Sequence, residues 1–391
     1  MELEALLSAR LSERKREHRY RYRRVLSSAQ GPRGVVDGKA MLSFASNDYL
    51  GLANHPKVTE ALTAAAKHCG VGSGASHLVN GHSHEHHQLE EALAEFTGRD
   101  RALLFGSGYM ANLACITALM SRSDWVLEDR LNHASLLDAG LHSGAAFKRY
   151  QHNSVGDAQK WAERLSGKQV SGHGMIVTDG VFSMDGDVAP LNALSDLAQS
   201  HNAWLMVDDA HGFGVLGPKG AGCVDDMGLS QQQVPILMGT LGKALGCYGA
   251  FIAGSDVLIE SLIQFARPYI YTTATPPAIA AAARAALKLV ELEPQRRECL
   301  NQHIAYFRRE AEHLPVTLLP SHSPIQPLLI GDEESTMAIA QGLESRGILV
   351  GAIRPPTVPN GTARLRITLS ASHTTDDITQ LLEVLHSHLS T

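Results

Sequence analysis

The sequence predicts an α/β protein with a large lobe on a mostly parallel sheet flanked by helices, followed by a smaller C-terminal α+β lobe. The first observation is length, because 391 residues exceed what one hydrophobic core usually supports. The second is that apolar helical stretches alternate with short apolar runs between residues 56 and 206, as in parallel-sheet proteins. The third is that strand-like and helical stretches mix after residue 316.

The elements follow in chain order. Residues 1–24 have the pattern of a helix with a basic end. The large lobe is expected to contain helices at 58–67, 88–96 and 110–119 and strands at 102–105, 174–178, 203–207, 236–238 and 249–253. Helices are expected from 274 to 314, and the last part combines strands at 326–330 and 363–369 with helices at 335–345 and 376–389. We therefore expect an N-terminal helix with short strands at 35–36 and 41–44 (1–50), a large domain (51–285) and a small domain (286–391).

Composition is that of a soluble globular protein, with 44% apolar and 19% charged residues. A formal charge of −6 argues against a nucleic-acid partner. No run approaches the roughly 18 apolar residues that a membrane span needs, and the start of the chain has no apolar signal segment. Five scattered cysteines indicate reduced thiols, so we expect a cytoplasmic protein without a membrane partner.

Two glycine motifs suggest nucleotide sites, and both fail in context. Residues 212–217 match GxGxxG, but Pro218 and further glycines follow where a dinucleotide site needs a helix to begin. Residues 239–243 resemble the end of a P-loop, but the first glycine and the hydroxyl after Lys243 are missing. We reject both sites.

Four histidines crowd residues 82–87. They run directly into a helical pattern, and no carboxylate or cysteine at ligand spacing completes a metal set. We therefore interpret them as a polar loop and helix start, and we expect no metal.

Three short pieces carry candidate chemistry. Ser107, Gly108 and Tyr109 form a strand-to-helix turn whose N–H groups can bind an anion. Asp208 ends a buried strand, where a carboxylate needs a partner such as a protonated pyridine nitrogen, while Asp209 should point to the opposite face. Lys243 follows an apolar strand among small residues, where it can reach a planar cofactor.

The order of these pieces, with Lys243 about 35 residues after Asp208, resembles the fold-type-I transferases that use pyridoxal 5'-phosphate (PLP). The segments at 46–51, 178–186, 207–212, 240–243 and 364–367 resemble the α-oxoamine synthase family in particular. Within it, residues 352–359, with Arg354-Pro355-Pro356, resemble the biotin-pathway member. These matches spread over essentially the whole chain.

The resemblance implies a role for each matching residue. Lys243 would hold PLP as a Schiff base, Asp208 would pair with the pyridine nitrogen, and His133 would stack on the ring. The resemblance implies that four residues are catalytic: Lys243, His133, Asp208 and His211. The other implied cofactor contacts are Ser107, Gly108, Tyr109, Ser183, Thr240, Thr272 and Thr273, the last two across a dimer interface. The implied substrate contacts are Arg21, Asn47, His133, Thr357 and Arg366.

The implied reaction is the decarboxylative condensation of L-alanine with a pimeloyl thioester, carried by CoA or by acyl carrier protein. The resemblance also implies a homodimer with shared active sites. Another α-oxoamine synthase, such as a glycine C-acetyltransferase, is the alternative activity. A non-catalytic subunit that only binds a partner is a further alternative, and the presence of Lys243, Asp208 and His211 argues against it.

Overall fold

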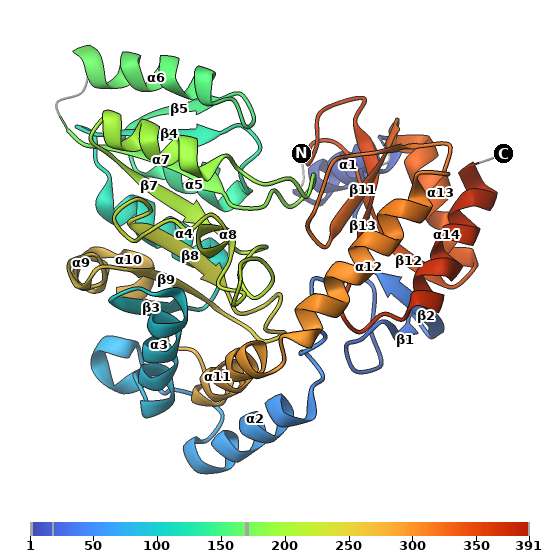
Figure 1. The fold of residues 1–391 in the computed structure, drawn as a ribbon, viewed down its shortest axis with the longest axis horizontal. Coiled ribbons are helices and arrows are strands. Elements are labelled where there is room, and N and C mark those ends of the chain that lie inside the picture. Colours follow the sequence, from blue (N-terminus) through green and yellow to red (C-terminus); the bar gives the residue numbers. More distant parts are fainter. Residues whose placement is uncertain (1–2, 18, 169–171, 390–391) are drawn as a thin grey trace. The chain divides into compact units, whose positions relative to one another are not determined.

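The computed structural model describes residues 3–17, 19–168 and 172–389, which group into two compact units. The large unit contains Asn47–Ser183 and Asp187–Glu298. The small unit contains three segments: the residues up to Ser46, Met184–Gly186, and the residues from Cys299 onward. The two units are described separately below (Figure 1).

The large unit is built on a seven-stranded sheet in the order β3-β9-β8-β7-β6-β4-β5. The neighbours from β8 to β5 pair in parallel, and only β9 runs against both of its neighbours. The prediction of a mostly parallel sheet is confirmed. The strands are β3 (Arg101–Phe105), β4 (Trp125–Asp129), β5 (Ala146–Tyr150), β6 (Gly174–Asp179), β7 (Ala203–Asp208), β8 (Ile236–Thr240) and β9 (Ala250–Gly254).

Helices cover this sheet because its strands are apolar on both faces, as buried parallel strands are. One core layer joins the sheet to α4 (Gly108–Leu119), α5 (Ala134–His142), α9 (Asp256–Phe265) and α10 (Arg267–Ile270). The other helices of this unit are α2 (Pro56–Cys69), α3 (His84–Thr97), α6 (Val155–Lys168), α7 (Leu191–Ser200), α8 (Cys223–Asp226) and α11 (Pro277–Leu292).

The small unit holds a six-stranded sheet in the order β1-β2-β12-β13-β11-β10. Its pairs are antiparallel except for β2 with β12. The strands are β1 (Arg33–Val36), β2 (Lys39–Phe44), β10 (Thr317–Leu318), β11 (Ile325–Gly331), β12 (Ile348–Ile353) and β13 (Ala363–Thr368). The helices are α1 (Leu3–Arg16), α12 (Gln295–Ala311), which begins in the large unit, α13 (Glu333–Ser345) and α14 (Thr375–Leu389).

One prediction about the start of the chain is wrong. The N-terminal helix stops at Arg16, and residues 19–24 are not helical, because the chain beyond them pairs as an extended segment. Ser27 donates to the Val35 carbonyl at 2.8 Å, and Asp37 donates to the Val25 carbonyl at 2.9 Å. The division into 1–50, 51–285 and 286–391 stays a prediction. In the structure β2 pairs with β12, which joins residues up to Ser46 to the compact unit that contains the C-terminus.

The other expected helices and strands are confirmed within a few residues of their expected ends. Among the described residues, no helix is both long and apolar enough to cross a membrane.

Candidate active site

The carboxyl ends of β6, β7 and β8 meet at one edge of the large sheet, where parallel strands commonly carry a ligand site. Asp179 ends β6 and is in register with Asp208 at the end of β7. Thr240 ends β8, and Lys243 follows three residues later. The structure therefore brings together Asp208, Thr240 and Lys243, which the sequence analysis selected separately.

Asp208 is buried and its carboxylate is held from two sides. Asn112 Nδ2 donates to Oδ2 at 2.7 Å, and the Ala210 N–H donates to Oδ1 at 3.0 Å. Asn112 also donates to Ser135 Oγ at 2.9 Å. Asp209 accepts from the Cys223 N–H at 2.6 Å, so the two adjacent acids do serve different faces of the strand. A fixed carboxylate with lone pairs to spare can accept from a ring N–H.

The turn at Ser107 opens α4 on the same side. Ser107 caps the helix, because its Oγ accepts from the Met110 N–H at 3.3 Å. A Cβ at Gly108 would lie 2.6 Å from Met238 Cε, so glycine keeps the start of the helix close to β8. The Tyr109 ring is 45% exposed, and its hydroxyl bonds Asp138. Gly108 and Asn112 lie about one helical turn apart, about 6 Å along the axis, so the anion-binding end lies near the acid.

Lys243 begins a buried line of hydrogen bonds. Its Nζ donates to His211 Nε2 at 2.8 Å, which leaves the ring proton of His211 on Nδ1. His211 Nδ1 lies 2.5 Å from the Tyr49 hydroxyl, and that hydroxyl donates to Asn47 Oδ1 at 3.3 Å. Tyr49 is fully buried. The line connects three predicted site residues through Tyr49, which the sequence analysis did not single out.

Gly246 holds the Lys243 loop against the segment that follows Tyr49. Its φ is +65°, and a Cβ there would lie 2.2 Å from the Ala53 nitrogen. Thr240 fixes the other side of the loop, because its Oγ1 accepts from the Gly242 N–H at 3.3 Å and donates to the Gly249 carbonyl at 3.0 Å. Thr240 thus shapes the loop that carries Lys243.

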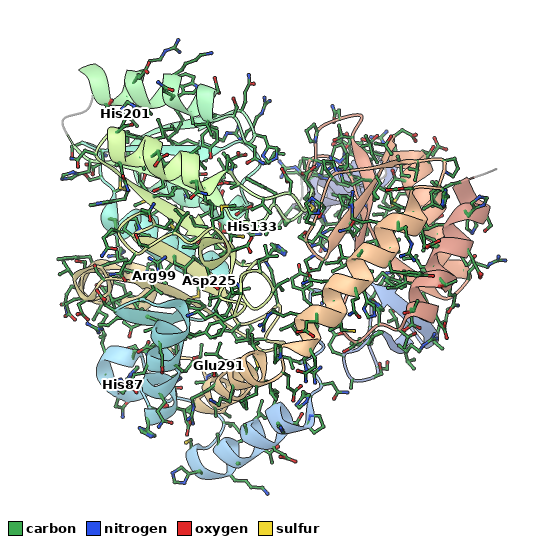
Figure 2. The ribbon with its side chains drawn as sticks, viewed as in Figure 1. His87, Arg99, His133, His201, Asp225 and Glu291 are labelled. Atoms are coloured by element: carbon green, nitrogen blue, oxygen red, sulfur yellow. The ribbon has the colours of Figure 1, made fainter. Side chains whose placement is uncertain are left out.

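His133 caps α5 (Figure 2). Its Nδ1 accepts from the backbone N–H of Ser135 at 3.2 Å, and the backbone N–H of His133 donates to Asp179 Oδ2 at 3.0 Å. Burial lowers the pKa of His133, and the nearby Asp208 carboxylate opposes this only in part. Burial and the Asp208 carboxylate raise the pKa of Asp179 well above its usual value. Asp179, like Asn112, is a buried neighbour that the sequence analysis missed.

The remaining predicted cofactor residues lie in loops of the large unit. Ser183 is half-buried in the turn after β6, Thr272 is half-buried and Thr273 is exposed.

The predicted substrate residues other than Asn47 and His133 belong to the small unit. Arg21 and Thr357 line one cavity of about 670 Å³ together with Arg354. Arg366 lies on β13, is buried, and donates to Thr368 Oγ1 at 3.0 Å. The structure therefore places Arg21 and Thr357 beside the same cavity of the small unit.

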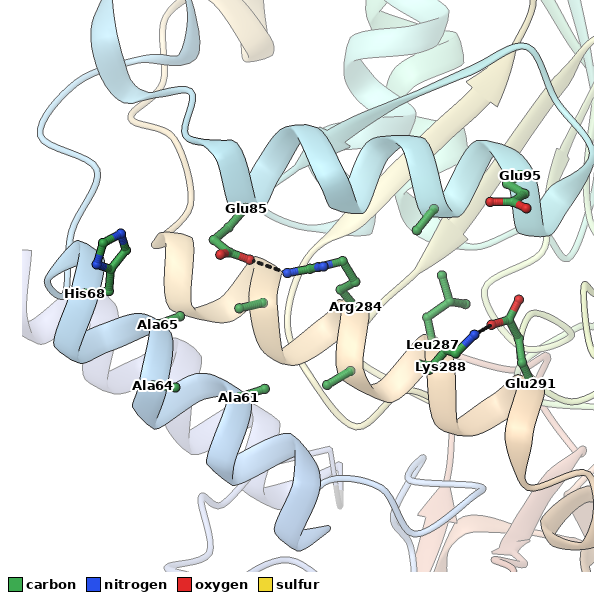
Figure 3. A pocket seen from close by; sticks show the side chains of 13 residues that line it. Ala61, Ala64, Ala65, His68, Glu85, Glu95, Arg284, Leu287, Lys288 and Glu291 are labelled. Atoms are coloured by element: carbon green, nitrogen blue, oxygen red, sulfur yellow. Dashed lines mark hydrogen bonds and ion pairs between the residues drawn. The ribbon is translucent and has the colours of Figure 1, made fainter.

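A second cavity, of about 660 Å³, lies in the large unit between α2, α3 and α11 (Figure 3). Alanines line much of it, and an ion pair joins Glu85 to Arg284 at 2.9 Å. It contains none of the predicted site residues.

The histidine segment differs from its expected lack of a carboxylate ligand. The structure brings a carboxylate, Glu90, to His82 and His87, so a possible ligand set does exist among the described residues. Sequence spacing hid this set because His82 lies before the helix and the other two residues lie on it. The loop at 212–217, in contrast, opens no regular helix, as predicted.

Comparison with known proteins agrees with this geometry. The family model of class I and II aminotransferases matches residues 39–385. The 8-amino-7-oxononanoate synthase of Cellvibrio japonicus is 60% identical over 98% of this chain and 95% of its own. That of Stutzerimonas stutzeri is 60% identical over 97% and 95%. The chain therefore belongs to the class I and II aminotransferase family and, within it, to the 8-amino-7-oxononanoate synthases.

Solved structures give the same result. A serine palmitoyltransferase from S. paucimobilis with PLP bound superposes with a TM-score of 0.94 at 30% identity, covering 99% of this chain and 98% of its own. The 8-amino-7-oxononanoate synthase of Francisella tularensis gives 0.78 at 32% identity, covering 90% and 98%.

The residues present fit PLP, the cofactor of this class. Free N–H groups at the start of α4 suit a phosphate, the held Asp208 carboxylate suits a ring nitrogen, and the Lys243 amine suits an aldehyde. Their positions on α4, β7 and the loop after β8 are fixed by the hydrogen bonds described above. The donor set therefore matches all three polar parts of the cofactor.

Proposed function

We propose that the protein catalyses the decarboxylative condensation of L-alanine with a pimeloyl thioester, which yields 8-amino-7-oxononanoate, CO2 and the free thiol carrier in biotin biosynthesis. The observation that carries the proposal is the buried line from Lys243 through His211 and Tyr49, next to the held Asp208 carboxylate. The names of the 60% identical relatives support the choice of reaction within the family.

PLP, when bound, supplies a protonated ring that accepts the electron pair released when bonds at the amino-acid α-carbon break. Lys243, Asp208 and His133 would hold it, with Ser107, Gly108, Tyr109 and Thr240 at its phosphate and Ser183 and His211 near its phenolic oxygen. Thr272 and Thr273 would reach a phosphate across the dimer interface.

Lys243 moves the proton in this proposal. Its Nζ takes the α-proton of alanine and returns a proton to the same carbon after CO2 has left. His211 accepts from Nζ at 2.8 Å and so fixes the direction of that amine. The bond that forms joins the alanine α-carbon to the thioester carbonyl carbon, and the carbon–sulfur bond that breaks releases the thiol. The carboxylate of alanine then leaves as CO2.

Two guanidinium groups suit the carboxylates of the two substrates. Arg366, with Asn47, would bind the alanine carboxylate, since a planar fork matches that group. Arg21 and Thr357 would bind the far carboxylate of the pimeloyl chain in the cavity that they line, and Arg354 adds a second positive charge there.

Two finer proposals concern the setting of the enzyme. We expect a homodimer, in which Thr272 and Thr273 would reach the partner's cofactor phosphate, and light scattering of the purified protein measures this directly. We also expect a cytoplasmic location, where reducing conditions would keep the five free cysteines as thiols.

The test is product analysis with the purified, PLP-loaded protein. L-alanine with pimeloyl-CoA or pimeloyl-acyl carrier protein should give 8-amino-7-oxononanoate by mass spectrometry, and the faster donor identifies the carrier. Turnover with glycine and acetyl-CoA but not with alanine and either pimeloyl donor would assign the chain to a different reaction. Turnover by a Lys243→Ala variant would refute the role given to Lys243.

A further inference from the structure

Three residues with metal-binding side chains meet where the chain enters α3. One ligand atom from each of His82, His87 and Glu90 lies within 4.8 Å of the other two. His87 and Glu90 are three residues apart on the helix and so share a face. His82 comes from the loop just before the helix. Figure 2 shows His87 on α3, well away from His133 and the active site.

The spacing is close to that of a zinc site. His82 Nε2 lies 3.8 Å from Glu90 Oε2. Around a tetrahedral Zn²⁺, bonds of 2.0–2.1 Å place neighbouring ligand atoms roughly 3.3 Å apart. Small rotations of the side chains of His82 and His87, which are 30% and 62% exposed, would close the difference.

The segment before α3 is held in place by its own packing. Gly81 ends the turn His77–Gly81, and a Cβ there would lie 2.2 Å from the Ala75 carbonyl oxygen, so the turn depends on glycine. Ser83 then caps α3, with its Oγ accepting from the His86 N–H at 3.5 Å. His82 therefore projects from a defined turn.

His77 forms a hydrogen bond with the ring nitrogen of His82 that faces away from Glu90, as metal-binding histidines usually have. Its Nδ1 lies 2.9 Å from His82 Nδ1, so the two rings share one proton and His82 Nε2 is left to face Glu90. His77 is buried and stacks on Tyr269 at 5.1 Å. Such outer partners fix the orientation of a ligating ring and raise its affinity for the metal.

His86 lies close by but is already occupied. Its Nδ1 accepts from the Ser83 N–H at 3.0 Å, and its Nε2 donates to the Thr275 carbonyl at 2.7 Å. A metal on His86 would break one of these bonds. The alternative set of His77, His82 and His86 is therefore the weaker candidate.

We propose that His82, His87 and Glu90 form a Zn²⁺ site that ties the turn at 77–82 to the first turns of α3. Two imidazoles and one carboxylate suit zinc, and the exposed side of the site leaves the fourth position to water. The ion has no part in the condensation reaction.

The test is zinc binding by the full-length, PLP-loaded protein after chelator treatment and dialysis. Competition with a chromophoric zinc chelator should give one site per chain in the wild type. His82→Gln, His87→Gln and Glu90→Gln should each weaken binding at least tenfold. His84→Gln is the matched control, since His84 is a histidine of the same segment outside both ligand sets, and it should bind like the wild type.

A second measurement separates metal loss from misfolding. The melting temperature should rise with zinc concentration in the wild type and in His84→Gln but not in His87→Gln, whose exposed side chain can be replaced without disturbing the core. Zinc affinity in all three ligand variants within twofold of the wild type would overturn the proposal. So would an equal loss in His84→Gln, or a wild type that binds no zinc.

Discussion

Replacing Tyr49 with phenylalanine tests the buried line at Lys243. The change removes one hydroxyl and leaves the ring in place, so His211 Nδ1 loses the partner that lies 2.5 Å away. A buried polar group deprived of its partner costs about 1–3 kcal/mol. If the line orients Lys243 in the transition state, kcat/KM should fall about 5- to 150-fold, at 1.36 kcal/mol per factor of ten.

The assay is the initial rate of CoA release from pimeloyl-CoA with saturating L-alanine. The fall should appear mainly in kcat, because Tyr49 positions the proton-moving group and does not bind the acyl chain. Tyr150→Phe is the control, since Tyr150 is 1% exposed but lies on β5 at the edge of the sheet. The reasoning is refuted if Tyr49→Phe retains wild-type kcat/KM within twofold, or if Tyr150→Phe loses as much.

Three further predictions follow from the described contacts. Asp208→Asn should lower kcat about 100- to 1,000-fold, the usual loss when an electrostatic stabiliser is removed, in the same CoA-release assay. Asp185→Ala should lower the free energy of unfolding by about 3 kcal/mol in urea, because it leaves Arg364, which is 4% exposed, without its ion-pair partner. Burial lowers the pKa of His152, but Asp129 at 3.0 Å and Asp187 at 2.9 Å raise it by more, so that the pKa is about 10. The stabilisation that protonated His152 gives the folded protein is therefore complete below pH 6.5 and is lost as the pH rises through about 10. Over that range, calorimetry should show a smaller fall in melting temperature for His152→Gln than for the wild type.

Much of the fold was predictable because its signals are local. The apolar runs at β6, β7 and β8, with helical periodicity between them, were enough to predict a parallel sheet from the sequence. The small unit was less predictable. Its parallel pair joins β2 to β12 across some three hundred residues, and no local pattern shows which distant strand will be the neighbour.

The site follows the same division. Residue type and position at the end of a strand were enough to predict Lys243, Asp208 and the Ser107 turn. They were not enough for Tyr49 and Asn112, although Tyr49 lies in the segment 46–51 on which the family resemblance rests. Asn112 could have been found from its position one helical turn after Gly108, which puts both on one face of α4.

The histidine segment shows the limit of arguments from spacing. A metal set was rejected because no carboxylate stood at a recognised interval from the four histidines, yet Glu90 is eight positions after His82 and faces it at 3.8 Å. Ser83, the extended N-cap residue of α3, separates His82 from the helix, so helical spacing does not predict which side chains of the helix His82 meets. Ligand spacing is diagnostic only where the backbone between the ligands is regular. Where a turn closes on a helix start, the hydrogen bonds of the segment decide which side chains remain available, and here they occupy His86 and leave His82 facing Glu90.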